Sequence, residues 1–140
     1  MKKIVLFCIA LFFCIYTANA DEENTNFLDS YRKVAELSWL GLAYCMGIDD
    51  ESEIEKELHN LSLDPTRYNV KIMDSKAAFE ELKQYIDREK EFYGISDENP
   101  KLDYKNFKGC IKMFYYGTGY GSGYHFEVER IVKKYCKDCK

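Results

Sequence analysis

A stretch near the C-terminus, YYGTGYGSGYH, places a glycine at every second position from Gly117 to Gly123, and glycine-rich loops often bind phosphate. A dinucleotide-binding fingerprint starting at Gly117 needs a glycine where Ser122 stands, and one starting at Gly119 needs it at Tyr124. A P-loop needs the same missing glycine, followed by lysine. Both motifs also follow a buried strand, whereas a helical pattern precedes this stretch. The sequence therefore excludes a phosphate-binding loop here.

The pair Cys136 and Cys139 has the Cys-x-x-Cys spacing of redox motifs and of half a zinc site. A thioredoxin-type pair needs a helix N-terminus, where the dipole lowers the thiol pKa, but this pair lies at the C-terminal end of the chain among lysines. A zinc site needs two further ligands, and neither the other cysteines nor His59 and His125 stand at ligand spacing. We therefore expect a structural disulfide, with no metal and no cofactor.

Acid–base or nucleophilic catalysis has few residues available, because the chain has only two histidines. His59 ends a short polar helical pattern and His125 begins the last one, so both are expected as exposed residues near helix ends. Nothing in the sequence assembles a nucleophile, a base and an oxyanion donor. The sequence does not predict an enzyme.

Residues 1–20 have the pattern of a cleaved signal peptide: a basic start, the apolar run IVLFCIALFFCIY, and the small-x-small site Ala18-Asn19-Ala20. The apolar run is shorter than the roughly 20 residues that a membrane-spanning helix needs. The sequence therefore predicts a single mature domain over residues 21–140, located in the periplasm or secreted, with no membrane association after cleavage.

The predicted mature chain is acidic. Removing residues 1–20, which contain Lys2 and Lys3 but no acidic residue, changes the net charge from −4 to −6. An acidic chain with no evident basic stripe argues against nucleic acid or anionic lipid as a partner. A basic protein partner fits this charge better.

Four of the six cysteines remain after the signal peptide is removed, and an even number in an exported chain predicts disulfides. Four cysteines allow three connectivities, which the sequence leaves open. We favour Cys45 with Cys110, because each stands in the middle of the apolar face of a predicted long helix, and Cys136 with Cys139 as a local bridge.

Apolar residues recur at helical spacing in five segments, which predicts an all-α, disulfide-stapled single domain of about five helices. The first begins near Phe27 and stops at Gly47, and Asp74 and Asp103 are candidate caps of the third and fourth. Residues 66–74 alternate like a strand, but no second strand is evident, so they are expected as an extended connector.

We expect the inner face of the first helix to include Phe27, Tyr31 and Trp39. The fourth helix is expected to place Tyr104 and Phe107 inside. The inner faces are expected to pack together as one bundle.

The segments SYRKVAELSWLGLAYCMG, AAFEELKQYIDREKEFY and FKGCIKMFYY, followed by a last helix, resemble the type VI secretion amidase immunity proteins of the Gram-negative periplasm. The resemblance implies an all-helical, dimeric protein that occludes the active-site cleft of a peptidoglycan-cleaving cysteine amidase. It also implies a Cys45–Cys110 pair and a role for the aromatic fourth helix around Phe107 and Tyr115.

Two segments are candidates for contacting such a partner. Residues 116–124 contain only Tyr, Gly, Ser and Thr, a composition typical of adaptable binding loops, and an ordinary connection between helices is the alternative. In ISDENPKLD, acidic residues could meet a basic cleft rim, with a solvated linker as the alternative. The predicted partner-binding residues are Tyr116, Tyr120, Ser122, Tyr124, Asp97 and Glu98.

Two other classes of function stay open at this stage. One is a different exported binding module, such as an inhibitor of a host enzyme or a virulence accessory protein. The other is a small hydrolase or metalloprotein that uses His59 or His125.

Overall fold

The computed structural model describes residues 27–48, 50–63, 70–96, 103–118 and 123–139. The predicted signal peptide over residues 1–20 lies outside these ranges. Five helices and two very short strands make up the described part, which confirms the predicted all-α class. Residues 27–45 form the first described helix, called helix 27–45 below. The other elements are α2 (Glu51–Ser62), β1 (Lys71–Ile72), α3 (Ser75–Glu89), α4 (Tyr104–Thr118), α5 (Gly123–Tyr135) and β2 (Cys136–Lys137).

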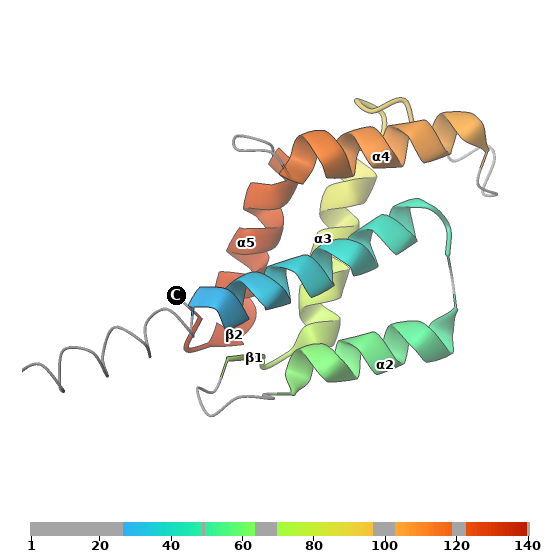
Figure 1. The fold of residues 1–140 in the computed structure, drawn as a ribbon. Coiled ribbons are helices and arrows are strands. Elements are labelled where there is room, and N and C mark those ends of the chain that lie inside the picture. The colour runs from blue at the N-terminus through green and yellow to red at the C-terminus, as the bar shows by residue number, and fades with distance from the viewer. Residues whose placement is uncertain (1–26, 49, 64–69, 97–102, 119–122, 140) are drawn as a thin grey trace, which may run out of the picture.

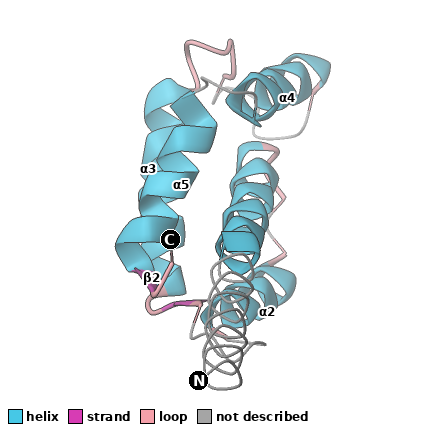
Figure 2. Ribbon diagram, turned by 60° about the vertical axis from the view of Figure 1, so that its left-hand side comes forward, coloured by secondary structure: helices cyan, strands magenta, loops and turns pink. Residues whose placement is uncertain are grey.

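The helices form two layers. Figures 1 and 2 show α4, helix 27–45 and α2 stacked in that order, with α3 and α5 crossing them as the second layer. The contacts between α3 and α5, and between each of them and the other layer, close the bundle. None of the described helices has the length and hydropathy of a membrane span.

Acidic side chains cap the starts of three helices, as expected for residues that accept hydrogen bonds from free N–H groups. Asp74 accepts from Ala77 N–H at 2.9 Å and Asp103 accepts from Asn106 N–H at 2.7 Å. Asp50 caps α2 by accepting from Glu53 N–H at 3.2 Å, and this bond lowers the pKa of the Asp50 carboxyl.

Glycines follow two of the helices. Gly47 and Gly94 follow helix 27–45 and α3 with φ angles of 68° and 73°, a region that favours glycine. The stop at Gly47 agrees with the sequence-based prediction, whereas α3 ends at Glu89 and Gly94 closes the turn that follows it.

The extended connector has a strand partner, which the sequence analysis missed. Lys71 lies opposite Lys137 and Ile72 opposite Cys136 in a two-residue antiparallel ribbon. Met73 N–H also donates to the carbonyl of Tyr135 at 2.8 Å. The partner was missed because β2 has only two residues and follows α5 directly, so it has no alternation of its own. The ribbon ties the α2–α3 connection to the end of α5.

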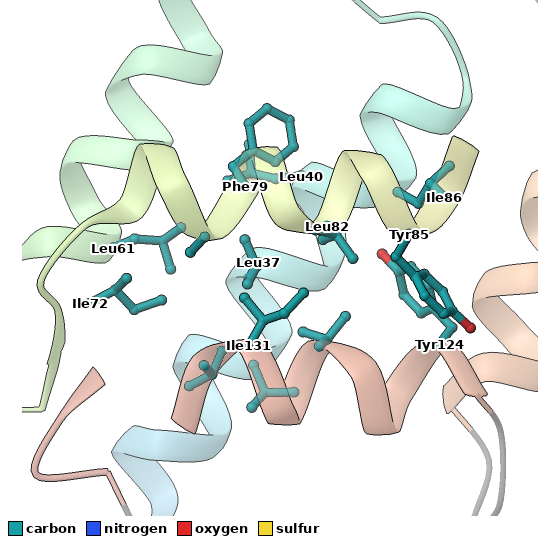
Figure 3. Close-up of a cluster of buried hydrophobic side chains, with 14 of the residues drawn as sticks. Leu37, Leu40, Leu61, Ile72, Phe79, Leu82, Tyr85, Ile86, Tyr124 and Ile131 are labelled. Carbon is teal, nitrogen blue, oxygen red and sulfur yellow. The ribbon is translucent and has the colours of Figure 1, made fainter. Parts of the chain in front are cut away.

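The core lies between the two layers. Figure 3 shows side chains from helix 27–45, α2, β1, α3 and α5 meeting there, with Tyr124 fully buried. Gly41 is required at the centre, because a Cβ on it would collide with the Tyr124 hydroxyl and lie 2.7 Å from Leu82 Cδ2. The other buried side chains labelled in Figure 3 are Leu37, Leu40, Leu61, Ile72, Phe79, Tyr85, Ile86 and Ile131.

Two disulfides reinforce the bundle, and they have the predicted connectivity. Cys45 and Cys110 join the end of helix 27–45 to the middle of α4, with a Cα–Cα distance of 5.8 Å. Cys136 and Cys139 close a short loop just after α5. The first bridge fixes two helices that the chain separates by 65 residues, so it holds the two long surface elements together.

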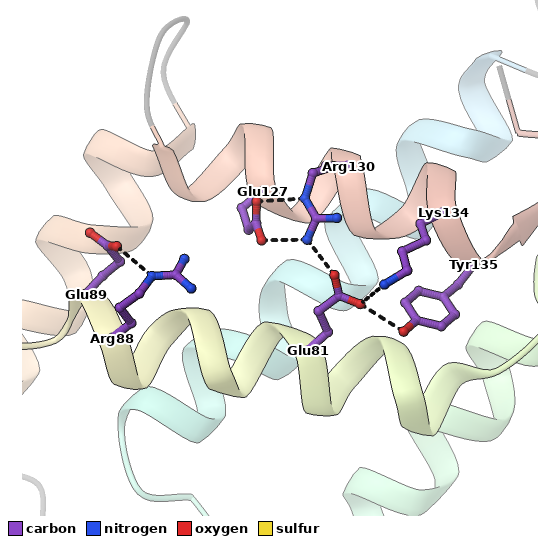
Figure 4. Close-up of polar contacts among 7 residues, drawn as sticks. All are labelled: Glu81, Arg88, Glu89, Glu127, Arg130, Lys134 and Tyr135. Atoms are coloured by element: carbon purple, nitrogen blue, oxygen red, sulfur yellow. Dashed lines mark hydrogen bonds and ion pairs between the residues drawn. The ribbon is translucent and has the colours of Figure 1, made fainter.

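A charged cluster links α3 to α5 (Figure 4). Glu81 accepts hydrogen bonds from Lys134 Nζ at 2.6 Å, Arg130 Nη2 at 2.5 Å and the Tyr135 hydroxyl at 2.8 Å. Arg130 also forms a two-bond pair with Glu127. The bonds from Lys134 and Arg130 lower the pKa of the Glu81 carboxyl to about 2.

Candidate partner-binding surface

Helix 27–45 buries charged side chains in its first half. The Lys33 side chain is almost wholly buried, and its Nζ lies 3.0 Å from the carbonyl of Asn60 and 3.3 Å from Glu36 Oε2. Asn60 lies in the last turn of α2, where the helix dipole favours a cation, and its carbonyl also accepts a hydrogen bond from Leu63 N–H at 3.1 Å. Asp29 is buried as well, 3.5 Å from Arg32. This inward placement of charge leaves apolar side chains to face outward.

The outer side of helix 27–45 is accordingly apolar, contrary to the predicted inner face. Phe27, Leu28, Tyr31 and Trp39 are all more than half exposed, and Trp39 is 62% exposed. The prediction was wrong for the aromatic residues because this helix is apolar on two sides, so periodicity did not say which side is covered. The core side is formed by Val34, Leu37, Leu40 and Leu42.

The side chains of α4 fall on three sides of the helix. Asn106, Cys110 and Met113 point into the molecule and are buried. A second side carries Tyr104, Phe107, Ile111, Phe114 and Tyr115, which are exposed or half-buried. The third side carries three exposed lysines, Lys105, Lys108 and Lys112. The predicted inner position of Tyr104 and Phe107 is therefore wrong, since the buried side is rotated toward Asn106 and Met113.

Trp39 joins the outer side of helix 27–45 to the second side of α4. The centre of its ring lies 5.1 Å from the centre of the Phe114 ring. The centre of the Phe114 ring lies 5.9 Å from that of the Tyr124 ring in the core. We call Trp39, Tyr104, Phe107, Ile111, Phe114 and Tyr115 the aromatic surface. The Cys45–Cys110 bridge joins its two helices, so the surface is held in place by covalent and core contacts.

The sequence-predicted contact residues have different outcomes. Tyr124 is a core residue and not a surface contact, because α5 begins at Gly123 and places Tyr124 on the same side as Val128, Ile131 and Val132. Its hydroxyl donates to the carbonyl of Ser38 at 2.8 Å. The loop predicted from composition, 116–124, therefore overlaps the end of α4 and the first two residues of α5.

The remaining predicted contacts are not placed. Tyr116 belongs to α4, but its side chain lies outside the described part of the structure. Tyr120, Ser122, Asp97 and Glu98 lie outside the described residues altogether. Their role in binding a partner stays a prediction.

The lysine row on α4 corrects the expectation that the chain has no basic stripe. Lys105, Lys108 and Lys112 are spaced i, i+3 and i+7, which puts them on one side of a helix. This signal was readable in the sequence, but the net negative charge obscured it. Net charge describes the whole molecule and says nothing about one helix face.

A hollow lies between helix 27–45, α2 and α3. It has a volume of about 510 Å³, and its apolar lining includes Tyr44, Ile54 and Phe79. Lys83 Nζ lies 5.2 Å from the centre of the Phe79 ring and 5.6 Å from that of Tyr44, and Lys76 pairs with Glu55 at 3.3 Å. Charged side chains thus surround the hollow and neutralise one another.

The described residues do not form a metal-binding cluster. They contain no group of three or more His, Cys, Asp or Glu side chains positioned to bind a metal ion. His59 is exposed in the last turn of α2, and His125 is half-buried in the first turn of α5.

Fold and surface together define a class: a small all-α domain, stapled by two disulfides, that exposes an aromatic surface across two bridged helices. Comparison of the chain with protein-family models, curated proteins and solved structures finds no significant match.

Proposed function

We propose that the protein is a periplasmic immunity protein, which binds a peptidoglycan-cleaving amidase toxin of type VI secretion and inhibits it by occluding the active-site cleft. The observation that carries this proposal is the aromatic surface, in which the Trp39–Phe114 contact joins helix 27–45 to α4. Exposed aromatic side chains on a preorganised support are typical of protein-binding sites, since they bury a large area on binding and lose little entropy.

Other features of the molecule agree with a binding role. Two disulfides are consistent with an oxidising, exported compartment, where a peptidoglycan-cleaving toxin acts. Phe107 and Tyr115, which the family resemblance singles out, are 41% and 71% exposed on α4. An inhibitor needs only a complementary surface and no reactive groups of its own.

We further propose that the free protein is a homodimer, as the resemblance implies. The apolar outer side of helix 27–45 around Leu28 and Tyr31 is available for a second copy. Light scattering after size exclusion measures the oligomeric state, and Tyr31→Glu is expected to shift a dimer to monomer. A monomer at every concentration tested would contradict this part of the proposal.

Co-expression tests the function. The amidase encoded beside this protein's gene is directed to the periplasm of a susceptible cell, with and without this protein. We expect the cells to survive only in its presence, and we expect the purified protein to inhibit the purified amidase stoichiometrically. Equal killing in both strains would refute the proposal, and recovery of a host enzyme in place of a bacterial hydrolase would favour an inhibitor of that host enzyme.

A further inference from the structure

The lysine row is the largest group of uncompensated positive charge on the described part of the chain. Lys105, Lys108 and Lys112 are exposed, and none of them forms an ion pair with a described residue. On α5, by contrast, Arg130 and Lys134 both pair with Glu81. The sequence of α4 contains no acidic residue that could neutralise the row.

The lysine row borders the aromatic surface. Successive residues of an α-helix are rotated by about 100°, so Tyr104 and Tyr115 fall next to the lysines and Phe114 falls farther round. Phe114 is also the residue that contacts Trp39. The aromatic surface therefore has Trp39 along one edge and the lysine row along the other.

We propose that the aromatic surface and the lysine row together dock an acidic protein surface, in which apolar groups cover the rings and carboxylates meet the lysines. This inference rests on the proposed function, because it specifies the chemistry of the amidase surface that surrounds the occluded cleft. A partner without carboxylates would desolvate three positive charges with no compensation, which opposes binding.

Two other occupants are outcomes of the test. A second copy of this chain that docked through the same face would present the same rings and further lysines, since α4 carries no carboxylate. An anionic bilayer would also attract the three lysines, and vesicle binding distinguishes it from a protein. An acidic protein surface can supply both carboxylates for the lysines and apolar groups for the rings.

Charges at the edge of an interface act mainly on the association rate. We therefore expect binding to weaken as salt is raised from about 50 mM to about 300 mM, because exposed charges are screened at shorter range in more concentrated salt. Removing the three lysines is expected to weaken binding about tenfold, mostly through slower association.

The test compares two variants with the same change in net charge. K105Q/K108Q/K112Q removes the lysine row, and the control K71Q/K133Q/K137Q removes lysines at the β1–β2 ribbon and the end of α5. Surface-immobilised binding kinetics measure the association of each full-length protein with the purified amidase. A second probe is the anionic aromatic dye bis-ANS, which combines rings with sulfonates. Trp39 is the only tryptophan in the chain, so energy transfer from it reports dye bound to the protein, and loss of this transfer in the lysine-row variant alone assigns the binding to this surface.

The outcomes separate the inference from the proposed function. A tenfold loss for the lysine-row variant, with the control close to wild type, supports the inference. Amidase binding that is unchanged in the lysine-row variant overturns the inference and leaves the proposed function standing.

If the wild-type protein does not bind the amidase, the proposed function fails and the dye decides the inference. The inference of an acidic, apolar partner is supported if energy transfer from Trp39 to the dye is lost in the lysine-row variant but kept in the control. Equal energy transfer in both variants overturns the inference. Lysine-dependent binding to phosphatidylglycerol vesicles in place of the amidase also overturns it in favour of a bilayer.

Discussion

The Tyr124 hydroxyl donates a hydrogen bond of 2.8 Å to the backbone carbonyl of Ser38, and this bond joins the first turn of α5 to helix 27–45. The hydroxyl also lies where a side chain at position 41 would have to be, so the bond depends on Gly41. Burial of the ring raises the pKa of Tyr124, because the charged phenolate would be desolvated. One side chain thus sets how closely α5 approaches helix 27–45.

Tyr124→Phe removes this hydrogen bond and keeps the ring. We expect a loss of about 1 kcal/mol in the free energy of unfolding, since a buried carbonyl loses a partner. Urea unfolding measures it as a lower midpoint with an unchanged slope. Tyr104→Phe, on a ring that is 78% exposed, is the control and should leave the midpoint unchanged. Equal midpoints for wild type and Tyr124→Phe would mean that the bond contributes nothing.

Helix positions were predictable from the sequence because the local signals agree with the fold. Asp74 and Asp103 are found as caps, and Gly47 as a stop, since each acts on backbone groups within a few residues. The β1–β2 pairing was not predictable, because it joins Lys71 to Lys137 and Ile72 to Cys136, far apart in the sequence, through only two residues on each side. Such contacts depend on where the helices place the chain.

Glu81→Gln is expected to reduce stability in a pH-dependent way. The folded-state pKa of Glu81, about 2, lies below its ordinary value of 4.5, so its stabilising contribution is fully present above about pH 5 and is lost as the pH falls toward 2. Because Arg130 and Lys134 are about half exposed, we expect a loss of only about 1–2 kcal/mol at neutral pH. Thermal unfolding between about pH 7 and pH 2.5 measures it.

The control for Glu81 is an exposed ion pair between α2 and α3. Glu55 pairs with Lys76, and both side chains are at least 70% exposed, so Glu55→Gln should change stability by less than about 0.5 kcal/mol at any pH. The difference in stability between Glu81→Gln and wild type should become smaller in acid. If it does not, the stabilisation does not come from the ionised carboxyl.

Removing each disulfide is expected to have unequal effects. Cys45–Cys110 closes 65 residues, so Cys45→Ser/Cys110→Ser should cost about 4 kcal/mol, whereas Cys136–Cys139 closes only three and its removal should cost about 1.5 kcal/mol. Urea unfolding of the two double variants gives the comparison. Similar losses for both pairs would indicate that loop closure does not dominate their contribution.

The candidate surface was only partly predictable from the sequence. Phe107 and Tyr115 were singled out by resemblance, but Trp39 was assigned to the core, because a helix that is apolar on two sides does not reveal which side a neighbour covers. Tyr124 was assigned to a surface loop, because composition does not mark the first residue of α5. In both cases the deciding fact was packing between helices, which local sequence does not contain.

Trp39→Ala tests the aromatic surface directly. Trp39 is 62% exposed and contacts Phe114, so truncation should weaken binding to the amidase by about 1–3 kcal/mol, as for tryptophans at the centre of interfaces, and should change folding stability by less than about 1 kcal/mol. Calorimetric titration measures the affinity and urea unfolding the stability. Phe92→Ala, at an 83% exposed ring beyond α3, is the matched control and should bind as wild type does. If Trp39→Ala also bound with wild-type affinity, the partner would have to dock elsewhere, and the hollow lined by Tyr44, Ile54 and Phe79 would be the next surface to test.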